Sequence, residues 1–323
     1  MNIITKIPTI SSIFSLFWAF FFFFIIILLP LEKSLAQNVT TDPSEVRALD
    51  SIFQQWDTQA TPLWNISGGP CSGSAIDETD FESNDNNPAI KCDCSYDNNR
   101  TCHITKLRVQ ALSKRGVIPE EITALKYLAV FKIDENYFTG PLPAYIGNLS
   151  GLMILSISHN AFYGSLPKEL GNLKDLFMLY LDSSGVGGEI PSTFANLRDV
   201  VVLWASDSPF SGKIPEFIGN WTRLTSLRFQ GNSIEGPIPS SFSQLTLLES
   251  LRISDIYNGS SSLDFVRNLK NLTELVLRNA LISGTVPSDI GNIERLATLD
   301  LSFNNLTGEI PSLLFNMNNL TYL

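Results

Sequence analysis

Histidine is almost absent from this 323-residue chain: only His103 and His159 are present. No serine stands in a G-x-S-x-G motif. Because hydrolytic catalysis needs a nucleophile, a base and an acid that converge, these absences argue against a hydrolase. No catalytic residue is predicted.

Basic residues are also scarce. The chain has 22 lysines and arginines against 32 acidic residues, a net charge of -10, and it contains no run of five basic residues. This balance argues against electrostatic binding to nucleic acid or to anionic lipid. A hydrophobic content of 44% is nonetheless sufficient for a folded core.

Only four cysteines occur, at Cys71, Cys92, Cys94 and Cys102. An even number of clustered cysteines predicts two disulfides in an oxidising compartment. Because Cys92 and Cys94 are poor partners for each other, we expect Cys71 to bond one of them and Cys102 the other. The single-residue gap between Cys92 and Cys94 does not fit a zinc site, and we predict neither a metal nor a cofactor.

No charged residue lies between Lys6 and Glu32, and the apolar run "FSLFWAFFFFFIIILLP" fills that interval. With Pro30 after the run and small residues at Ser34 and Ala36, the pattern predicts a signal peptide over residues 1–36. The competing reading is an uncleaved membrane anchor, since about 20 apolar residues span a bilayer. Either way, the residues that follow are translocated.

Glycosylation sequons support the same compartment. Nine Asn-x-Ser/Thr sites are present, which is dense for a chain of this length and fits a cell-surface or secreted glycoprotein. They are Asn38, Asn65, Asn99, Asn148, Asn220, Asn258, Asn271, Asn305 and Asn319.

An apolar residue recurs every 24 positions, and a second series follows three residues later. The first series is Ile104, Leu128, Leu152, Leu176, Val200, Leu224, Leu248, Leu272, Leu296 and Leu320, and the second runs from Leu107 through Phe131 to Leu299. Such a period predicts a leucine-rich-repeat solenoid. We expect nine repeats over 104–319 and the start of a tenth at 320–323.

The segment "LSISHN", Leu155 to Asn160, shows how each repeat is built. Alternation predicts a short parallel strand whose leucines point inward while Ser156 and Ser158 face the concave side. The asparagine satisfies the backbone of the turn, and irregular or 3-10 segments follow on the convex side. Serine replaces this asparagine in some repeats, and the repeat over 248–271 loses its glycine and proline, so we expect a reshaped coil there.

A cap is expected before the repeats, over residues 37–103, because a solenoid otherwise exposes the core of its first coil. Asp42 as N-cap and Pro43 at the first helical position predict a helix. Its apolar face is expected to carry Val46, Leu49, Phe53 and Trp56. The acidic stretch "IDETDFESNDNN" lacks the spacing of a calcium loop, and we interpret it as a solvated loop.

Four motifs of the chain are "NxLxGxIP", "WNISGGPCSG", "IKCDCSY" and "LDLSFNNLTGEIPSLLFN". With these motifs the chain resembles plant leucine-rich-repeat receptor-like serine/threonine kinases and is similar to the subfamily with a malectin-like ectodomain. The resemblance implies an extracellular region that binds a protein co-receptor, a wall-derived carbohydrate or a peptide, and a membrane contact made only through other parts. No G-x-G-x-x-G, H-R-D or D-F-G motif is present, so kinase chemistry is not expected in these residues.

The alternative interpretation is a self-contained secreted repeat protein, such as a polygalacturonase inhibitor. A finished solenoid needs a closing cap, and the sequence stops within a repeat, which favours the receptor.

Outward-facing strand positions are the candidate binding site. The residue between the two strand leucines forms a column along the concave face, comprising Arg108, Lys132, Ser156, Tyr180, Trp204, Arg228, Arg252, Val276 and Asp300. Tyr180, Trp204, Arg228 and Arg252 are contiguous and of the types enriched at binding hot spots, and we expect Trp204 to stack on a sugar ring or a peptide side chain. The alternative is that tyrosine and tryptophan merely suit exposed strands.

The signal-peptide prediction has a direct test. Secreted protein is expected to begin at Gln37, because the cleavage site follows Ala36, and glycosidase treatment is expected to lower its mass. N-terminal sequencing and mass spectrometry measure both. Retention of Met1 would contradict the prediction.

Overall fold

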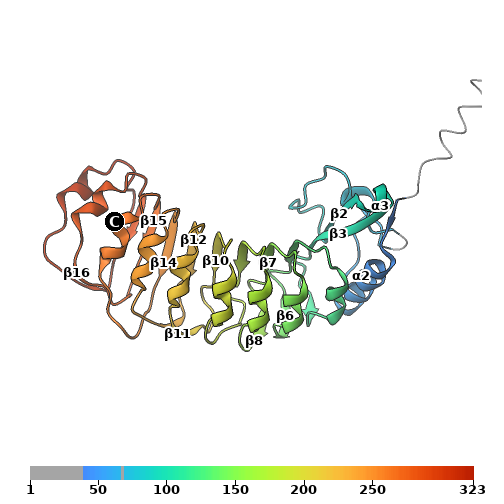
Figure 1. The fold of residues 1–323 in the computed structure, drawn as a ribbon, viewed down its shortest axis with the longest axis horizontal. Coiled ribbons are helices and arrows are strands. Elements are labelled where there is room, and N and C mark those ends of the chain that lie inside the picture. The colour runs from blue at the N-terminus through green and yellow to red at the C-terminus, as the bar shows by residue number, and fades with distance from the viewer. Residues whose placement is uncertain (1–38, 67–68) are drawn as a thin grey trace, which may run out of the picture.

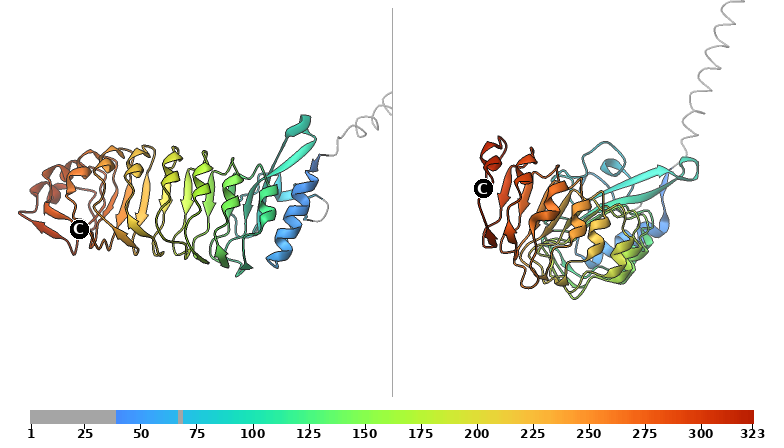
Figure 2. Two further views of the ribbon diagram at one scale, coloured as in Figure 1. Left: turned by 60° about the horizontal axis from the view of Figure 1, so that its bottom comes forward. Right: turned by 60° about the vertical axis from the view of Figure 1, so that its left-hand side comes forward.

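The computed structural model describes residues 39–66 and 69–323, so the expected signal peptide and the sequon at Asn38 lie outside the described residues. The described part forms a curved solenoid whose coils stack side by side (Figure 1). The N-terminal cap closes one end, and its helix lies beside the first coils (Figure 2). The predicted leucine-rich-repeat fold is confirmed.

The concave wall is a sheet to which each coil adds one short parallel strand. Its strands are β1 (Thr40–Thr41), β2 (Ala89–Ser95), β3 (Thr101–Arg108), β5 (Val130–Lys132), β7 (Ile154–Ser156), β9 (Met178–Tyr180), β10 (Val202–Trp204), β12 (Ser226–Phe229), β14 (Ser250–Ile253), β15 (Glu274–Val276) and β17 (Thr298–Asp300). They follow one another in chain order, except that β2 pairs antiparallel with β3 at the cap and β1 lies outside β3.

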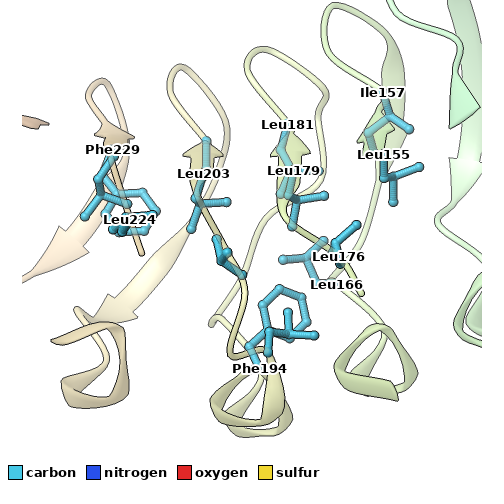
Figure 3. Packing of buried hydrophobic residues seen from close by; sticks show 14 of the residues in the cluster. Leu155, Ile157, Leu166, Leu176, Leu179, Leu181, Phe194, Leu203, Leu224 and Phe229 are labelled. Atoms are coloured by element: carbon cyan, nitrogen blue, oxygen red, sulfur yellow. The ribbon is translucent and has the colours of Figure 1, made fainter. Parts of the chain in front are cut away.

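Neighbouring strands pair leucine against leucine. Leu155 pairs with Leu179, and Leu179 pairs with Leu203. Their side chains are at most 2% exposed, and Figure 3 shows them on adjacent strands with Phe194 reaching toward them from the outer wall. Because neighbouring strands lie about 5 Å apart, the core of each coil is closed by the coils on either side.

The outer wall consists of 3-10 helices and three small sheets. The helices of the repeats are η2 (Glu120–Ala124), η3 (Ala144–Asn148), η4 (Lys168–Asn172), η5 (Ser192–Asn196), η6 (Glu216–Asn220), η7 (Ser240–Gln244), η8 (Leu263–Asn268), η9 (Ser288–Asn292) and η10 (Ser312–Asn316). The sheets are formed by β4 (Arg115–Gly116), β6 (Tyr137–Pro141) and β8 (Ala161–Tyr163), by β11 (Ser211–Lys213) and β13 (Ser233–Glu235), and by β16 (Ser283–Thr285) and β18 (Asn305–Thr307). Among the described residues, no helix is long and apolar enough to span a bilayer.

The repeat asparagines bond the coils together, and Asn160 shows the pattern. Its Nδ2 donates to the carbonyl oxygens of Ile133, Ile157 and Ser158 at 3.0, 3.0 and 3.1 Å. Its Oδ1 accepts from the backbone N–H of Phe138 at 3.0 Å. One side chain therefore forms hydrogen bonds with backbone groups of two consecutive coils. These groups need a partner within the protein, because buried polar groups are almost always hydrogen-bonded.

Replacing Asn160 with alanine should lower the free energy of unfolding by about 1 to 3 kcal/mol, because it leaves buried backbone groups without partners. Urea unfolding followed by circular dichroism measures the change. The matched control is Asn172→Ala, since Asn172 is exposed at the end of η4. Equal stability of the two variants would show that the asparagine bonds do not hold the coils together.

Serine takes over part of this bonding where asparagine is missing. Ser208 Oγ donates to the carbonyl of Leu181 at 3.0 Å and accepts from the N–H of Ser184 at 3.2 Å. The repeat over 248–271 is reshaped as expected: Gly259, with a φ of 76°, packs so closely on Gly236 that a Cβ would lie 2.5 Å from its carbonyl carbon. The strands on either side of this coil still pair in register.

The cap helix α2 (Pro43–Gln55) begins where the sequence predicts it, with the Asp42 carboxylate accepting from the N–H of Ser44 at 2.7 Å. Its buried face differs from the expected one. Val46 is only half-buried, whereas Glu45 and Ile52 are buried. At the end of the helix, Trp56 donates from Nε1 to the carbonyl of Val117 at 2.9 Å, which joins the cap to the first coil.

Glu45 is buried because it holds the start of the first coil. Its carboxylate accepts from the backbone N–H of Ile104 at 2.7 Å and lies 2.8 Å from Nδ1 of His103. Burial raises the pKa of the Glu45 carboxyl. The His103 ring stacks on Tyr127 at 3.9 Å, with Tyr96 packed against both. His103 is thus part of the cap core.

The cysteines form two disulfides, Cys71–Cys92 and Cys94–Cys102. This is one of the two pairings that the sequence left open. The first bond ties the segment before η1 (Gly73–Ala75) to β2. The second bond closes the short connection between β2 and β3, which contains α3 (Tyr96–Asn99). Both bonds hold the cap against the edge of the sheet.

The last coil has a neighbour on one side only within the described residues, and its apolar residues are exposed. Ile310, Phe315 and Leu323 are 61%, 71% and 65% exposed, whereas the leucines of the middle strands are almost fully buried. Each exposed large side chain lacks roughly 1.5 to 3 kcal/mol of burial.

Hydrogen exchange of this chain should therefore be fast from about Leu306 to Leu323 and slow in β9, β10 and β12, which have paired strands on both sides. Mass spectrometry of peptides from exchanged protein measures the difference. Equal protection of the last coil and of β10 in a monomer would contradict this prediction.

Candidate ligand-binding face

The predicted column is contiguous on the concave face. Tyr180 pairs with Trp204, Trp204 with Arg228, and Arg228 with Arg252, on strands β9, β10, β12 and β14. All four side chains are half-buried. The structure thus brings the four candidate residues together, while their role in binding stays a prediction.

Trp204 is enclosed by its neighbours in the column. The Tyr180 ring meets it edge-on with centroids 5.0 Å apart, and the Arg228 guanidinium lies 3.7 Å from its centroid. These two residues come from strands on opposite sides of β10, and Nε1 of Trp204 donates to Ser226 Oγ at 2.8 Å. The Arg228 guanidinium thus covers part of the Trp204 indole along the column, while the expected stacking of Trp204 on a sugar ring or a peptide side chain stays a prediction.

Arg252 is neutralised where it stands. Its guanidinium pairs with the Glu274 carboxylate and donates to Gln230 Oε1 at 3.3 Å. Glu274 also accepts from Ser250 Oγ at 2.7 Å. These bonds hold the pKa of Glu274 below its usual range and raise the pKa of Arg252. Arg252 is thus committed to an internal pair.

Arg228 differs from Arg252 although both occupy the same strand position. Within residues 39–66 and 69–323 the Arg228 guanidinium has neither an ion pair nor a hydrogen bond, whereas that of Arg252 has both. The Nε atoms of both arginines are buried without a partner. The Arg228 charge lowers the pKa of the Asp182 and Glu274 carboxyls, but neither carboxylate forms an ion pair with Arg228. Arg228 is therefore an oriented guanidinium that lacks a carboxylate.

The Asp182 carboxylate forms a hydrogen bond with a backbone N–H and no ion pair with Arg228. Its Oδ1 accepts from the N–H of Ser206 at 2.6 Å. Burial raises the pKa of the Asp182 carboxyl, while that N–H and the Arg228 charge oppose the rise. The carboxylate is consequently a neighbour of the site and not a partner of the guanidinium.

An apolar shoulder lies beside the guanidinium. Tyr180 Oη donates to Met178 Sδ at 3.3 Å, and Val202, two positions before Trp204 on β10, is 8% exposed. Burial raises the pKa of the Tyr180 phenol. The site combines one uncompensated positive charge with an adjoining apolar surface.

Sequence reasoning missed the residues that flank the column. Met178, Asp182, Gln230 and Glu274 each stand two positions from a column residue. Because residues i and i+2 of a strand share a face, the same alternation that defined the column could have found them.

The start of the column is covered by the cap. Arg108 is 2% exposed and donates to three backbone carbonyls of the loop at 77–88, including that of Glu82 at 3.0 Å. Lys132 pairs with the Glu82 carboxylate at 2.7 Å, and Phe81 is 8% exposed against the sheet. Most residues of this acidic segment are exposed, in line with the solvated loop that the sequence predicts, but Phe81 and Asn86 are buried and the segment folds over the concave face at the capped end (Figure 1).

The described sequons are accessible with one exception. Asn271 is half-buried, and its Nδ2 donates to the carbonyl of Thr246 at 2.8 Å. The exposed ones are Asn65, Asn99, Asn148, Asn220, Asn258, Asn305 and Asn319. Glycosylation at these sites stays a prediction. In the same described part, no three His, Cys, Asp or Glu side chains converge to hold a metal ion.

Comparison with known proteins places these features in a family context. Three segments, at residues 151–173, 223–245 and 295–317, match the family described as Leucine Rich Repeat. A probable LRR receptor-like serine/threonine-protein kinase of Arabidopsis thaliana is 52% identical over 90 residues, which cover 28% of this chain and 9% of that protein. The matched part is thus about a tenth of the relative's length.

Solved structures extend the likeness along most of the chain. The LRR ectodomain of the Arabidopsis thaliana membrane receptor kinase GASSHO1/SCHENGEN3, in complex with CASPARIAN STRIP INTEGRITY FACTOR 2, superposes with a TM-score of 0.69 at 25% identity, over 85% of this chain and 34% of that chain. A plant ice-binding protein has a TM-score of 0.64 at 25% identity, over 87% of this chain and 94% of that chain.

The malectin-like domain suggested by the sequence motifs is not tested by these matches and stays a prediction. The chain is a leucine-rich-repeat solenoid, and its relatives are plant LRR receptor-like serine/threonine kinases.

Proposed function

We propose that this chain is the extracellular recognition part of a plant receptor-like serine/threonine kinase and that it binds a ligand along its concave face. The observation that carries the proposal is Arg228, a guanidinium oriented by Trp204 and left without a carboxylate partner in the described part. Disulfides, sequons and a signal-peptide pattern support an extracellular location. The relatives support the receptor context.

The chain contributes binding in this proposal, and phosphate transfer belongs to kinase segments of the receptor. A protein co-receptor is the partner through which binding outside the cell would reach the kinase. A self-contained secreted binder would use the same concave face, so a binding measurement tests ligand binding at this face under both interpretations.

The chemistry of the site favours a ligand with a carboxylate beside an apolar group. A planar guanidinium matches a carboxylate through two parallel hydrogen bonds, and Met178 and Tyr180 supply the adjoining apolar surface. A peptide with a free or acidic end and a uronic-acid oligomer from the cell wall share this carboxylate. The cap loop closes the column at Arg108 and Lys132, so the ligand lies from Tyr180 toward the C-terminal coils.

Binding should depend on the ligand's charge and on Arg228. The probes are two matched pairs: a heptapeptide library with free or amidated C-termini, and galacturonic-acid oligomers with free or methyl-esterified carboxyls. We expect the wild-type chain to prefer the acid form of one pair by at least about tenfold, which is about 1.4 kcal/mol. Arg228→Gln should abolish that preference, and Trp204→Ala should weaken it by about 1 to 3 kcal/mol. Calorimetry measures both effects.

The matched control is Arg295→Gln, which removes the same charge from an exposed residue outside the column. Its affinity for each probe should equal that of the wild type. If Arg228→Gln binds the acid probes as well as the wild type does, or if the wild type does not distinguish acid from neutral forms, the concave column is not the binding site.

A further inference from the structure

A second surface lies on the flank of the solenoid, where the chain enters each strand. The residue two positions before the buried strand leucine is apolar in three consecutive coils, at Met153, Phe177 and Val201. Met153 is 40% exposed. In the preceding coil the equivalent residue is Ala129, which continues the row with a smaller apolar side chain, and in the following coil the polar Thr225 ends the row.

These residues line an open groove of about 510 Å³ together with Met178 and three charged residues. Asp199 is neutralised by Arg223, whose Nη1 lies 2.6 Å from its Oδ1. Asp175 is exposed and has no ion pair within the described ranges. The groove thus has an apolar floor and one uncompensated carboxylate, so it is complementary to an apolar side chain next to a positive charge.

The pattern of sequons leaves this flank uncovered. In four consecutive coils the outer 3-10 helix ends in an exposed asparagine, namely Asn148, Asn172, Asn196 and Asn220. The first and the fourth are sequons, but Lys174 and Arg198 occupy the position of the required serine or threonine in the middle two. The groove lies beside those middle coils. Three steps of about 5 Å separate the outer sequons, so the window between two glycans is roughly 15 Å wide.

We infer that this flank groove binds a protein partner through a single narrow segment that carries an apolar side chain beside a lysine or arginine. An α-helix, about 10 to 12 Å in diameter, fits the window, whereas a broad protein face would meet the glycans predicted at Asn148 and Asn220. A second copy of this chain would bring its own pair of glycans against the same window. Asp175 repels a polyanion, and a polycation has no apolar group to pack against the floor of the groove.

Glycan placement tests the inference without disturbing the core. Lys174→Ser and Arg198→Thr create sequons at Asn172 and Asn196, which place a glycan inside the window. Glu294→Thr creates a sequon at Asn292, which ends η9 at the equivalent position of a coil outside the groove. The probe is a displayed library of random 12-residue peptides, selected on the wild-type glycoprotein.

The selected peptides should carry an apolar residue adjacent to lysine or arginine. Their affinity should fall at least tenfold on both glycan variants and on Phe177→Ser, and should not change on Glu294→Thr. The double variant Lys174→Ser, Asn172→Gln lacks the new glycan and should restore binding, which separates masking from misfolding. Because the readout is peptide binding at the flank, it is independent of the Arg228 experiment.

Three results would overturn the inference. The first is that no peptide is enriched. The second is that the enriched peptides lack the apolar and basic pair or bind the glycan variants as well as the wild type. The third is that sedimentation equilibrium shows self-association of the wild type that Phe177→Ser abolishes, which would make a second copy the occupant of the groove.

Discussion

No coil of this protein can bury its apolar residues alone, and the whole architecture depends on that constraint. Each leucine needs its counterparts on both sides, so equivalent residues pair across the sheet, as Leu155 does with Leu179. The repeat length is kept even where the coil is reshaped around Gly259, because a slipped register would break the contacts of both neighbours. The cap meets the same need at the first coil, through Trp56 and its bond to Val117.

This constraint explains which features of the fold the sequence predicts. The inward apolar residues and the turn asparagines recur with the 24-residue repeat. The strands and the core can therefore be predicted from the sequence. The position of the cap loop at 77–88 could not be predicted, because it depends on the contacts of Arg108 with the Phe81 ring and the Glu82 carbonyl. The burial of Glu45 could not be predicted for a related reason. A carboxylate is expected to be exposed unless its hydrogen-bond partners are known, which here are the N–H of Ile104 and the His103 ring.

The candidate site divides in the same way. Alternation and the period place Tyr180, Trp204 and Arg228 on one face, since both rules concern the backbone. The role of each side chain depends instead on contacts between strands. Arg228 and Arg252 occupy equivalent positions, yet Glu274 pairs with only one of them, and the enclosure of Trp204 arises from neighbours one repeat away on each side.

The stacking of the coils restricts the inward positions to apolar residues and leaves the outward positions free to vary. Binding residues are therefore expected where the outward residues depart from the repeat. Both candidate surfaces meet that condition, and both lie on the middle coils, where strands are paired on each side. A group held there is already ordered before a partner arrives, which reduces the entropy lost on binding. Trp204 adds to this by holding the Arg228 guanidinium 3.7 Å from its ring centroid. The same leucines that stabilise the solenoid thereby keep its binding groups in place.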